Sequence, residues 1–198
     1  MQKTLKHEAK LNDLIDKGMM LLWSRGYNAT SVNDIVQVAD VPKGSFYFYF
    51  ESKEDFAVKA IEKYFNQMFP PALAILQEAS VSPKQRIIDF YVFRVKVLKE
   101  ELDCKMGCMG CNLALEMAEH NEAIRNIINE KNELVRSHIQ SVVEKAQEQG
   151  EIDRNVNAAN LVSFMEDAGK GAMTTMKEQN SAAPINNFTE MLQTIILK

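Results

Sequence analysis

Apolar residues recur along most of the chain at intervals of three and four, the spacing that places side chains on one face of an α-helix. The first such run contains Leu11, Leu14, Ile15 and Leu22 and stops before Gly26. Glycine is common just after the last turn of a helix, because it adopts the left-handed backbone at little steric cost. The pattern therefore predicts an amphipathic helix that ends near Gly26.

Two short helices are predicted next. Ser31 is followed three residues later by Asp34, the spacing of a capping box that opens a helix. The tight break "ADVPKG" then leads into a third segment, where Pro42 suits the first turn of a helix. Three short helices, with a turn between the last two, have the form of a helix-turn-helix, whose second helix enters the major groove of DNA.

Five aromatic residues follow one another in the third segment, from Phe46 to Phe50. Their alternation also fits a strand, but Pro42 before them and the capping spacing of Ser52 and Asp55 after them favour a helix. On a helix, Phe46 and Phe50 share one face and are expected in the core. The three rings between them are spread around the rest of the helix and need another explanation.

The rest of the chain also has helical patterns. They predict a long helix from Ser52 interrupted at Pro70-Pro71, a helix from about Pro83 to Glu101, a short one around Asn112 to Ala118, and one from Glu122 to Gln149 closed by Gly150. Two strongly amphipathic helices follow, which either complete the core or form a bundle with a second copy. The expected fold class is all-α, with an N-terminal three-helix helix-turn-helix DNA-binding domain at 1–50 and a larger C-terminal helical domain at 51–198.

Composition narrows the function. The chain has 198 residues, 46% of them hydrophobic, and a net charge of −4, which gives no general attraction to nucleic acid, so any DNA contact must be local. No apolar stretch has the length of a membrane span and the first residues lack the apolar core of a signal peptide, so we expect a cytoplasmic location and no membrane partner. Three cysteines confined to 104–111 argue against a secreted disulfide framework.

The stretch "ATSVNDIVQVADVPKGSFYFYFESKEDF" resembles the DNA-binding signature of the TetR family of bacterial transcriptional regulators, without a gap from Gly26 to Phe56. The helical remainder has the size and helix order of the family's ligand-binding and dimerisation region. The resemblance implies a homodimeric repressor, joined here through the last two helices, that binds a near-palindromic operator in double-stranded DNA. It implies release when an unknown small-molecule inducer binds the larger domain. We expect no enzyme activity, no cofactor and no metal ion.

Carried over position by position, the family pattern assigns Phe46 and Phe50 to the core of the small domain. It assigns these residues to the DNA side: Ser31, Asn33, Lys43, Ser45, Tyr47, Phe48, Tyr49 and Lys53. Lysine ammonium and tyrosine hydroxyl groups can bond phosphate, and Phe48 can contact a thymine methyl group. The alternatives are that Asn33 only caps its helix and that Phe48 or Tyr49 packs on the first helix. Asp40 stands where the family usually has glycine, which leaves the geometry of that turn open.

The stretch "CKMGCMGCN" holds all three cysteines and in part resembles a TetR subgroup with "GC-x-x-G-N" at this position. Some members of that subgroup respond to electrophiles or oxidants through the cysteine. Here Cys111 replaces the usual glycine and can supply a resolving thiol. Both Cys108 and Cys111 lie where the short helix is predicted to begin, and a helix N-terminus activates a thiol. We expect redox sensing by Cys108, with Cys111 or Cys104 as second thiol and Lys177 as a basic neighbour.

Other interpretations of the cysteines stay open. Free cysteines often behave as small buried hydrophobes, which we expect of Cys104. Three thiolates with His120 could complete a tetrahedral metal site, although a second paired Cys/His element is missing. The alternative function is a helical thiol redox enzyme using Cys-x-x-Cys. Such enzymes want a histidine shortly after the second cysteine, and here His120 is nine residues beyond Cys111.

The resemblance also indicates which helices surround a ligand cavity. The candidate ligand contacts on them are Tyr64, Met68, Phe90, Arg94, Asn112, Glu116 and Met165. For each of these residues, an ordinary core or surface role is favoured over ligand contact. The chain's 11 methionines would make a compliant apolar pocket, although methionine also simply fills gaps.

Overall fold

The computed structural model describes the backbone of residues 2–197 and the side chains of residues 8–194 and 197. Helices account for most of this backbone, and the described residues contain no strand. The predicted all-α fold class is confirmed. None of the described helices combines the length and apolar character that a membrane crossing requires. The chain divides into two compact units, and each unit is built from two separate stretches of the sequence.

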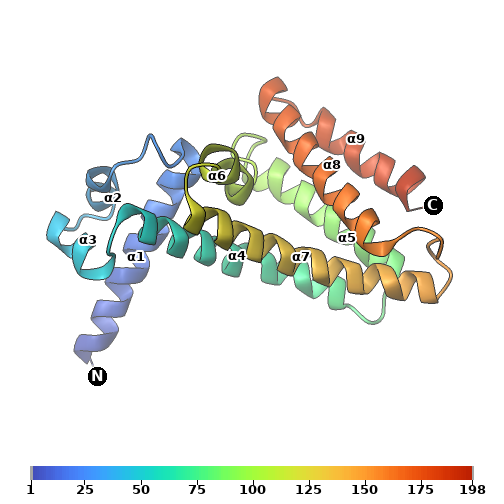
Figure 1. The fold of residues 1–198 in the computed structure, drawn as a ribbon, viewed down its shortest axis with the longest axis horizontal. Helices are drawn as coiled ribbons and strands as arrows, with labels where there is room; N and C mark the ends of the chain where they lie inside the picture. Colours follow the sequence, from blue (N-terminus) through green and yellow to red (C-terminus); the bar gives the residue numbers. More distant parts are fainter. Residues whose placement is uncertain (1, 198) are drawn as a thin grey trace. The chain divides into compact units, whose positions relative to one another are not determined.

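The first unit contains residues 1–67 and 109–131. It holds α1 (Gln2–Arg25), α2 (Val32–Val38), α3 (Lys43–Tyr49), the start of α4 (Lys53–Gln77), α6 (Met109–Met117) and the start of α7 (Glu122–Glu148). Helix α2 packs on α1 and α3 packs on α2, as the ribbon shows (Figure 1). Helix α6 also contacts α1, although more than 80 residues separate them in the chain. The predicted helix-turn-helix is confirmed.

Local signals set the ends of the first three helices. Gly26 follows α1 with φ +88°, the left-handed backbone that glycine favours. Asp40 lies in the turn between α2 and α3 with φ +53°, a conformation that aspartate tolerates better than most residues. The turn therefore keeps the left-handed position that glycine would occupy, and Asp40 accepts the strain. Fully buried Leu22, Ile35 and Phe46 tie the three helices together.

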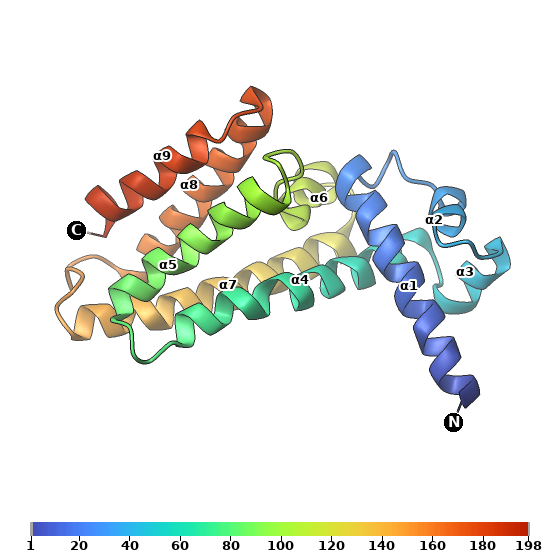
Figure 2. The ribbon, with the colours of Figure 1, turned by 180° about the vertical axis from the view of Figure 1, so that it is seen from behind.

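The second unit contains residues 68–108 and 132–198. Its described elements are the end of α4, α5 (Pro83–Lys96), the π-helical turn η1 (Val97–Glu101), the rest of α7, α8 (Ala158–Gln179), α9 (Ala183–Met191) and the π-helical turn η2 (Leu192–Ile196). Helix α9 packs against both α8 and α5, and α8 and α9 run side by side in both views (Figures 1 and 2). Buried Ile87, Phe90, Met165 and Phe188 belong to its core.

One predicted break is wrong. Helix α4 runs from Lys53 to Gln77 with Pro70 and Pro71 inside it. A proline inside a helix removes a backbone donor and costs about 3 kcal/mol. Burial after the prolines offsets this cost, because Ala72 and Leu76 are four residues apart and only 4% and 2% exposed.

Other helix boundaries differ slightly. The helix predicted from Pro83 to Glu101 is α5, which gives way to η1 after Lys96, and the short helix begins at Met109 rather than near Asn112. The helix from Glu122 ends at Glu148, before Gly150 with φ +74°, as predicted. The contact-based units group residues differently from the predicted domains 1–50 and 51–198, and that domain boundary stays a prediction.

Candidate nucleic-acid interface and thiol region

Helix α3 is a helix of two turns with well-defined ends. Pro42 precedes it with an extended backbone (φ −62°, ψ 147°), and its carbonyl oxygen accepts a hydrogen bond from the Ser45 N–H at 2.8 Å. Phe50 leaves the helix with φ −133° and ψ 134°, while its N–H still donates to the Phe46 carbonyl oxygen at 2.9 Å. A helix, and not a strand, therefore carries the aromatic run.

One side of α3 is anchored in the core. Phe46 is 0% and Phe50 2% exposed, and their ring centroids lie 5.1 Å apart. Phe56 of α4 lies 5.6 Å from the Phe46 ring and 5.0 Å from the Phe50 ring. Such aromatic clusters combine large apolar burial with favourable ring geometry. The predicted burial of Phe46 and Phe50 is confirmed.

The other side of α3 is what we call the recognition surface: Lys43, Ser45, Tyr47, Phe48 and Tyr49. Phe48 is 71% and Tyr47 56% exposed, Lys43 is exposed, and Ser45 and Tyr49 are half-buried. The Phe48 and Tyr49 rings meet edge to face at 5.2 Å. The exposure of Phe48 excludes the alternative that this ring is buried against α1. The surface offers a cation, hydroxyl groups and an apolar ring.

Helix α2 opens with the predicted capping box. The Ser31 hydroxyl accepts from the Asp34 N–H at 3.1 Å, and the Asp34 carboxylate accepts from the Ser31 N–H and hydroxyl at 2.8 and 2.6 Å. The bonds from the Ser31 hydroxyl and then its N–H lower the pKa of Asp34. Ser31 is thus engaged in the cap, and Asn33 is exposed. Contact of either residue with DNA stays a prediction.

Lys53 has a structural role that the sequence did not indicate. Its ammonium group donates to the carbonyl oxygens of Tyr27 and Thr30 at 2.8 and 2.9 Å and lies 4.0 Å from the centre of the Tyr27 ring. Burial lowers the pKa of Lys53, while the Glu116 carboxylate opposes that shift. Burial also raises the pKa of Tyr27. Two of the three Lys53 donors are therefore used within the protein, and its predicted DNA contact stays untested.

Glu116 lies on α6 and was predicted as a ligand contact. Its carboxylate accepts hydrogen bonds from the Tyr27 and Asn28 N–H groups at 2.8 and 2.7 Å. These amides belong to the loop between α1 and α2. The structure thus shows a partner for Glu116 on the protein's own backbone, and ligand contact remains a prediction. No local pattern predicts this pairing, because Tyr27 and Asn28 precede Glu116 by 89 and 88 residues.

The three cysteines are half-buried. Cys104 packs against a cluster of Leu98, Met176 and Ile185, which fits the small-hydrophobe interpretation of this residue. Cys111 lies in the first turn of α6, and Cys108 lies just before that helix. Lys177 is exposed near the end of α8. Thiol chemistry at these positions stays a prediction.

A buried polar cluster connects α5 and α8. The Glu166 carboxylate accepts from the Tyr91 hydroxyl at 2.9 Å and from Arg94 Nη1 at 2.5 Å, and Glu166 is only 6% exposed. Burial raises the pKa of Tyr91, and Glu166 adds to the shift. Burial opposes the charge on Arg94, but Glu166, then Tyr91 and also Cys108, outweigh it and raise the pKa of Arg94.

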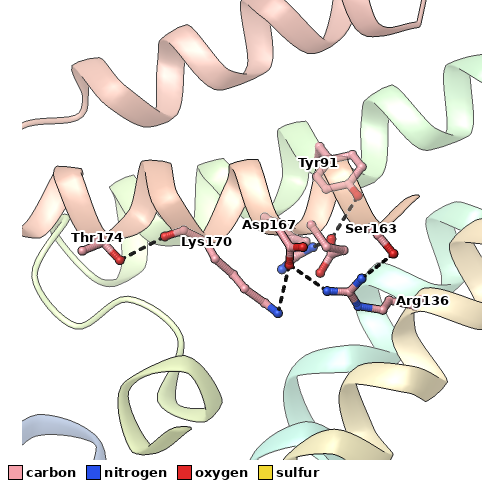
Figure 3. Close-up of polar contacts among 8 residues, drawn as sticks. Tyr91, Arg136, Ser163, Asp167, Lys170 and Thr174 are labelled. Atoms are coloured by element: carbon pink, nitrogen blue, oxygen red, sulfur yellow. Dashed lines mark hydrogen bonds and ion pairs between the residues drawn. The ribbon is translucent and has the colours of Figure 1, made fainter. Parts of the chain in front are cut away.

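Glu166 was not among the residues predicted from the sequence. A signal was available, because Glu166 follows Val162 by four residues and so falls on the apolar stripe of α8, where a carboxylate requires a partner. A second network lies on the same helix, where Arg136 of α7 bonds Ser163 and Asp167 at 2.8 Å each (Figure 3). Lys170 lies 3.6 Å from the same Asp167 carboxylate.

The remaining candidate ligand residues fall into different surroundings. In the second unit, Phe90 and Met165 are buried, Met68 is 37% exposed, and the Arg94 guanidinium lies 5.2 Å from the centre of the Phe90 ring. In the first unit, Tyr64 contacts Trp23 at 5.0 Å between ring centroids, and Asn112 is half-buried. Phe90, Arg94 and Met165 thus belong to the second unit, whereas Tyr64 belongs to the core of the first unit.

Metal binding has no support in the described part of the chain. Within it, no group of three or more His, Cys, Asp or Glu side chains is placed to hold a metal ion. His120 is exposed in the turn that follows α6.

A helix-turn-helix with an exposed aromatic and basic face, followed by a larger helical region, defines the class of one-chain DNA-binding regulators. A model of "bacterial regulatory proteins, tetR family" matches residues 14–60, and a model of the "tetracyclin repressor-like, C-terminal domain" matches residues 83–192. The second model alone spans more than half of the chain. The chain belongs to the TetR family, and the resemblance drawn from the sequence is confirmed.

Named relatives agree with the family. The HTH-type transcriptional repressor DhaR of Mycobacterium sp. (strain GP1) is 29% identical over 175 residues, 88% of this chain and 86% of that protein. A crystal structure of the regulatory protein TetR from Rhodobacter sphaeroides has a TM-score of 0.83 and 27% identity, covering 91% of this chain and 95% of that one. The first of these relatives is named as a transcriptional repressor and the second as a regulatory protein.

The repressor NemR of Escherichia coli (strain K12) is 27% identical over 129 residues, 65% of this chain and 64% of that protein. The crystal structure of its reduced form has a TM-score of 0.83 at 23% identity, covering 94% of this chain and 96% of that one. This structural likeness establishes the fold. The cysteine-motif subgroup stays a prediction.

Proposed function

We propose that the protein is a homodimeric transcriptional repressor that binds a near-palindromic operator through the recognition surface of α3. The observation that carries the proposal is the division of α3 into a buried side, Phe46 and Phe50, and an exposed side dominated by Phe48, Tyr47 and Lys43. The Phe48 ring is 71% exposed and lies beside the 56% exposed Tyr47, so α3 presents a contiguous aromatic surface that is suited to contact with a partner. As a regulator of bacterial DNA, the protein acts in the cytoplasm.

Each recognition residue has a distinct role in this proposal. Lys43 and the hydroxyl groups of Ser45, Tyr47 and Tyr49 bond phosphate oxygens and fix the register of α3. Phe48 contacts a thymine methyl group at the floor of the major groove. Ser31, Asn33 and Lys53 approach the backbone from α2 and α4. The net charge of −4 makes binding depend on these local contacts rather than on general attraction.

Dimerisation places two recognition helices one helical turn of DNA apart, about 34 Å. We assign it to α8 and α9. The assignment is supported by Phe164 of α8, which is 60% exposed although it sits on an otherwise amphipathic helix. A ring in that position is suited to an apolar contact with the same helix of a second copy.

The signal that releases the operator is a small molecule or the modification of Cys108 by an electrophile or oxidant. A hydroperoxide would transfer one oxygen to the Cys108 thiolate, giving a sulfenate and an alcohol. The sulfenic acid then condenses with the thiol of Cys111 or Cys104, forming a disulfide and releasing water. Cys108 lies just before α6, where a helix N-terminus favours the reactive thiolate, and its charge is among those that raise the pKa of Arg94. Lys177 is assigned as a second basic group.

A small-molecule inducer would instead occupy the second unit. Arg94, Phe90 and Met165 supply a charged group and apolar core surface from α5 and α8, and these are the residues we assign to such a ligand. Met68 of the predicted set also belongs to the second unit, whereas Tyr64, Asn112 and Glu116 belong to the first unit and stay separate predictions. Release requires a coupling of roughly 1–3 kcal/mol, which weakens operator binding by about five- to 150-fold.

The test is selection of DNA fragments by the purified protein, repeated after hydroperoxide treatment and again after reduction. We expect one near-palindromic sequence in the reduced protein, its loss after oxidation and its return after reduction. C108S should keep binding under oxidant, while C104S should still release at least in part. Absence of any selected sequence would refute the repressor assignment. Release of C108S equal to that of the wild type would refute the role of Cys108 alone.

A further inference from the structure

The loop between α1 and α2, residues 26–31, sets where the helix-turn-helix begins. Within the loop, the Thr30 hydroxyl donates to the Gly26 carbonyl oxygen at 2.7 Å, and the Thr30 N–H donates to the Tyr27 carbonyl oxygen at 3.2 Å. Thr30 is 0% exposed. Side chains that reach the loop from other elements add to these bonds.

Glu116 reaches the loop from α6. One carboxylate oxygen accepts from the Tyr27 N–H at 2.8 Å, and the other accepts from the Asn28 N–H at 2.7 Å. Both oxygens are thus used on consecutive amides, a charge-assisted arrangement that is stronger and more directional than ordinary hydrogen bonds. A Cβ at Gly26 would lie 2.6 Å from Glu116 Oε2. A side chain at residue 26 would displace the Glu116 carboxylate, and the φ of +88° also favours glycine there.

Lys53 holds the same loop by its acceptors. Its ammonium group donates to the Tyr27 and Thr30 carbonyl oxygens at 2.8 and 2.9 Å, so Tyr27 is bonded by Glu116 at its N–H and by Lys53 at its carbonyl. The two opposite charges also attract each other across the loop. Lys53 starts α4, whereas Glu116 lies near the end of α6. The loop is thus held jointly by two helices that are distant in sequence.

We infer that Glu116 is a positioning residue for DNA recognition: its carboxylate, carried by α6, fixes the loop that orients α2 and α3. The inference rests on the proposed function and adds a route of regulation to it. Helix α6 begins at Met109, so Cys111 lies within its first turn and Glu116 one to two turns further on. Any ligand or thiol modification that shifts α6 along or about its axis withdraws the carboxylate from Tyr27 and Asn28 and frees the loop.

The principal test is E116Q, with E119Q as its matched control. A glutamine can accept only one of the two N–H bonds through its carbonyl oxygen, and its NH₂ group faces the other donor. Glu119 is exposed near the same end of α6, so E119Q removes the same charge without touching the loop. We expect E116Q to weaken binding of the selected operator by roughly five- to 150-fold, the range of ordinary allosteric coupling. E119Q should bind within about twofold of the wild type.

The outcomes separate positioning from simple stabilisation. If E116Q lowers the unfolding temperature while its folded fraction binds the operator with the wild-type Kd, Glu116 only stabilises the fold and the inference is wrong. If the wild type selects no operator, the proposed function fails and the inference falls with it. If the wild type and E116Q bind the operator equally well, only the inference fails.

Hydrogen exchange on the wild-type protein keeps the test independent of how well a variant folds. The Tyr27 and Asn28 amides should exchange more slowly than unprotected peptide amides. Exchange at the unprotected rate would show that the Glu116 contact does not persist in solution and would overturn the inference. In folded E116Q, at least one of these amides should lose its protection, while amides inside α2 should keep theirs.

Discussion

Phe46 and Phe48 lie two residues apart on α3 and should respond in opposite ways to truncation. Phe46 is 0% exposed and contacts the Phe50 and Phe56 rings at 5.1 and 5.6 Å, so F46A removes a fully buried ring. Such a change costs about 3–5 kcal/mol. Phe48 is 71% exposed, so F48A should change the free energy of unfolding by no more than about 0.5 kcal/mol.

Operator binding should show the opposite order of sensitivity for folded protein. Burying a phenylalanine ring contributes about 1.5–3 kcal/mol, and a ring that is partly buried in a groove gains the lower part of this range. F48A should therefore weaken operator binding by about tenfold, which corresponds to about 1.4 kcal/mol. Unfolding can be followed by fluorescence of Trp23, the single tryptophan, which lies in the same unit and is 4% exposed.

The assays are urea unfolding and fluorescence anisotropy with labelled operator. A loss of more than about 2 kcal/mol of stability in F48A would show that Phe48 is part of the core and would refute the division of α3. Unchanged operator affinity in a stable F48A would refute its place on the recognition surface. Operator affinity can be measured only for folded F46A, so the decisive measurement for this variant is its unfolding midpoint in urea.

Three further perturbations follow from the structure. G26A should lower the free energy of unfolding by about 1–2 kcal/mol, because φ is +88° and the new Cβ meets Glu116 at 2.6 Å. The new Cβ of G171A on α8 meets nothing within 4 Å, so this variant should gain about 0.5–1 kcal/mol. Equal melting temperatures of the two variants would contradict this. E166A leaves Arg94, whose side chain is 32% exposed, without its ion-pair partner and should cost about 3 kcal/mol in urea unfolding, the lower end for a broken buried pair. E178A, at an exposed site of α8, is the neutral control. A loss of stability below about 1 kcal/mol in E166A would argue against the buried pair. The pKa of Asp34 is lowered in the folded protein, so the stability that Asp34 contributes is complete above the ordinary carboxyl pKa of 3.8 and is lost as the pH falls through the folded value. The melting temperature of D34N should therefore depend less on pH on the acid side than that of the wild type. A parallel pH dependence in D34N and the wild type would refute this role of Asp34.

Short-range patterns carried most of the fold. Helix ends at Gly26 and Gly150 and the Ser31–Asp34 cap are encoded within a few residues, so the sequence sufficed to predict them. The burial of Phe46 and Phe50 followed from their spacing of four. Pro70 and Pro71 show the limit of such rules, because burial of the residues after them overrides the local cost of proline.

The contacts of Glu116, Lys53 and Glu166 could not be predicted from local patterns. Each depends on which distant element lies opposite, and Glu116 and Glu166 bond partners between 72 and 89 residues away. The apolar stripe of α8 can indicate that Glu166 is buried, but the sequence does not indicate which residue pairs with it. From the sequence, Glu116 is predicted as a ligand contact and Lys53 as a DNA contact, whereas in the structure both side chains bond the loop before α2.

The central claim is that the exposed side of α3 lies against the operator. Photo-crosslinking tests it most directly, with p-benzoylphenylalanine in place of Phe48 and, as the control, in place of the exposed Phe164 of α8. We expect a crosslink to the selected operator from position 48 and none from position 164. A protein that binds the operator but crosslinks from position 164 and not from position 48 would contradict it.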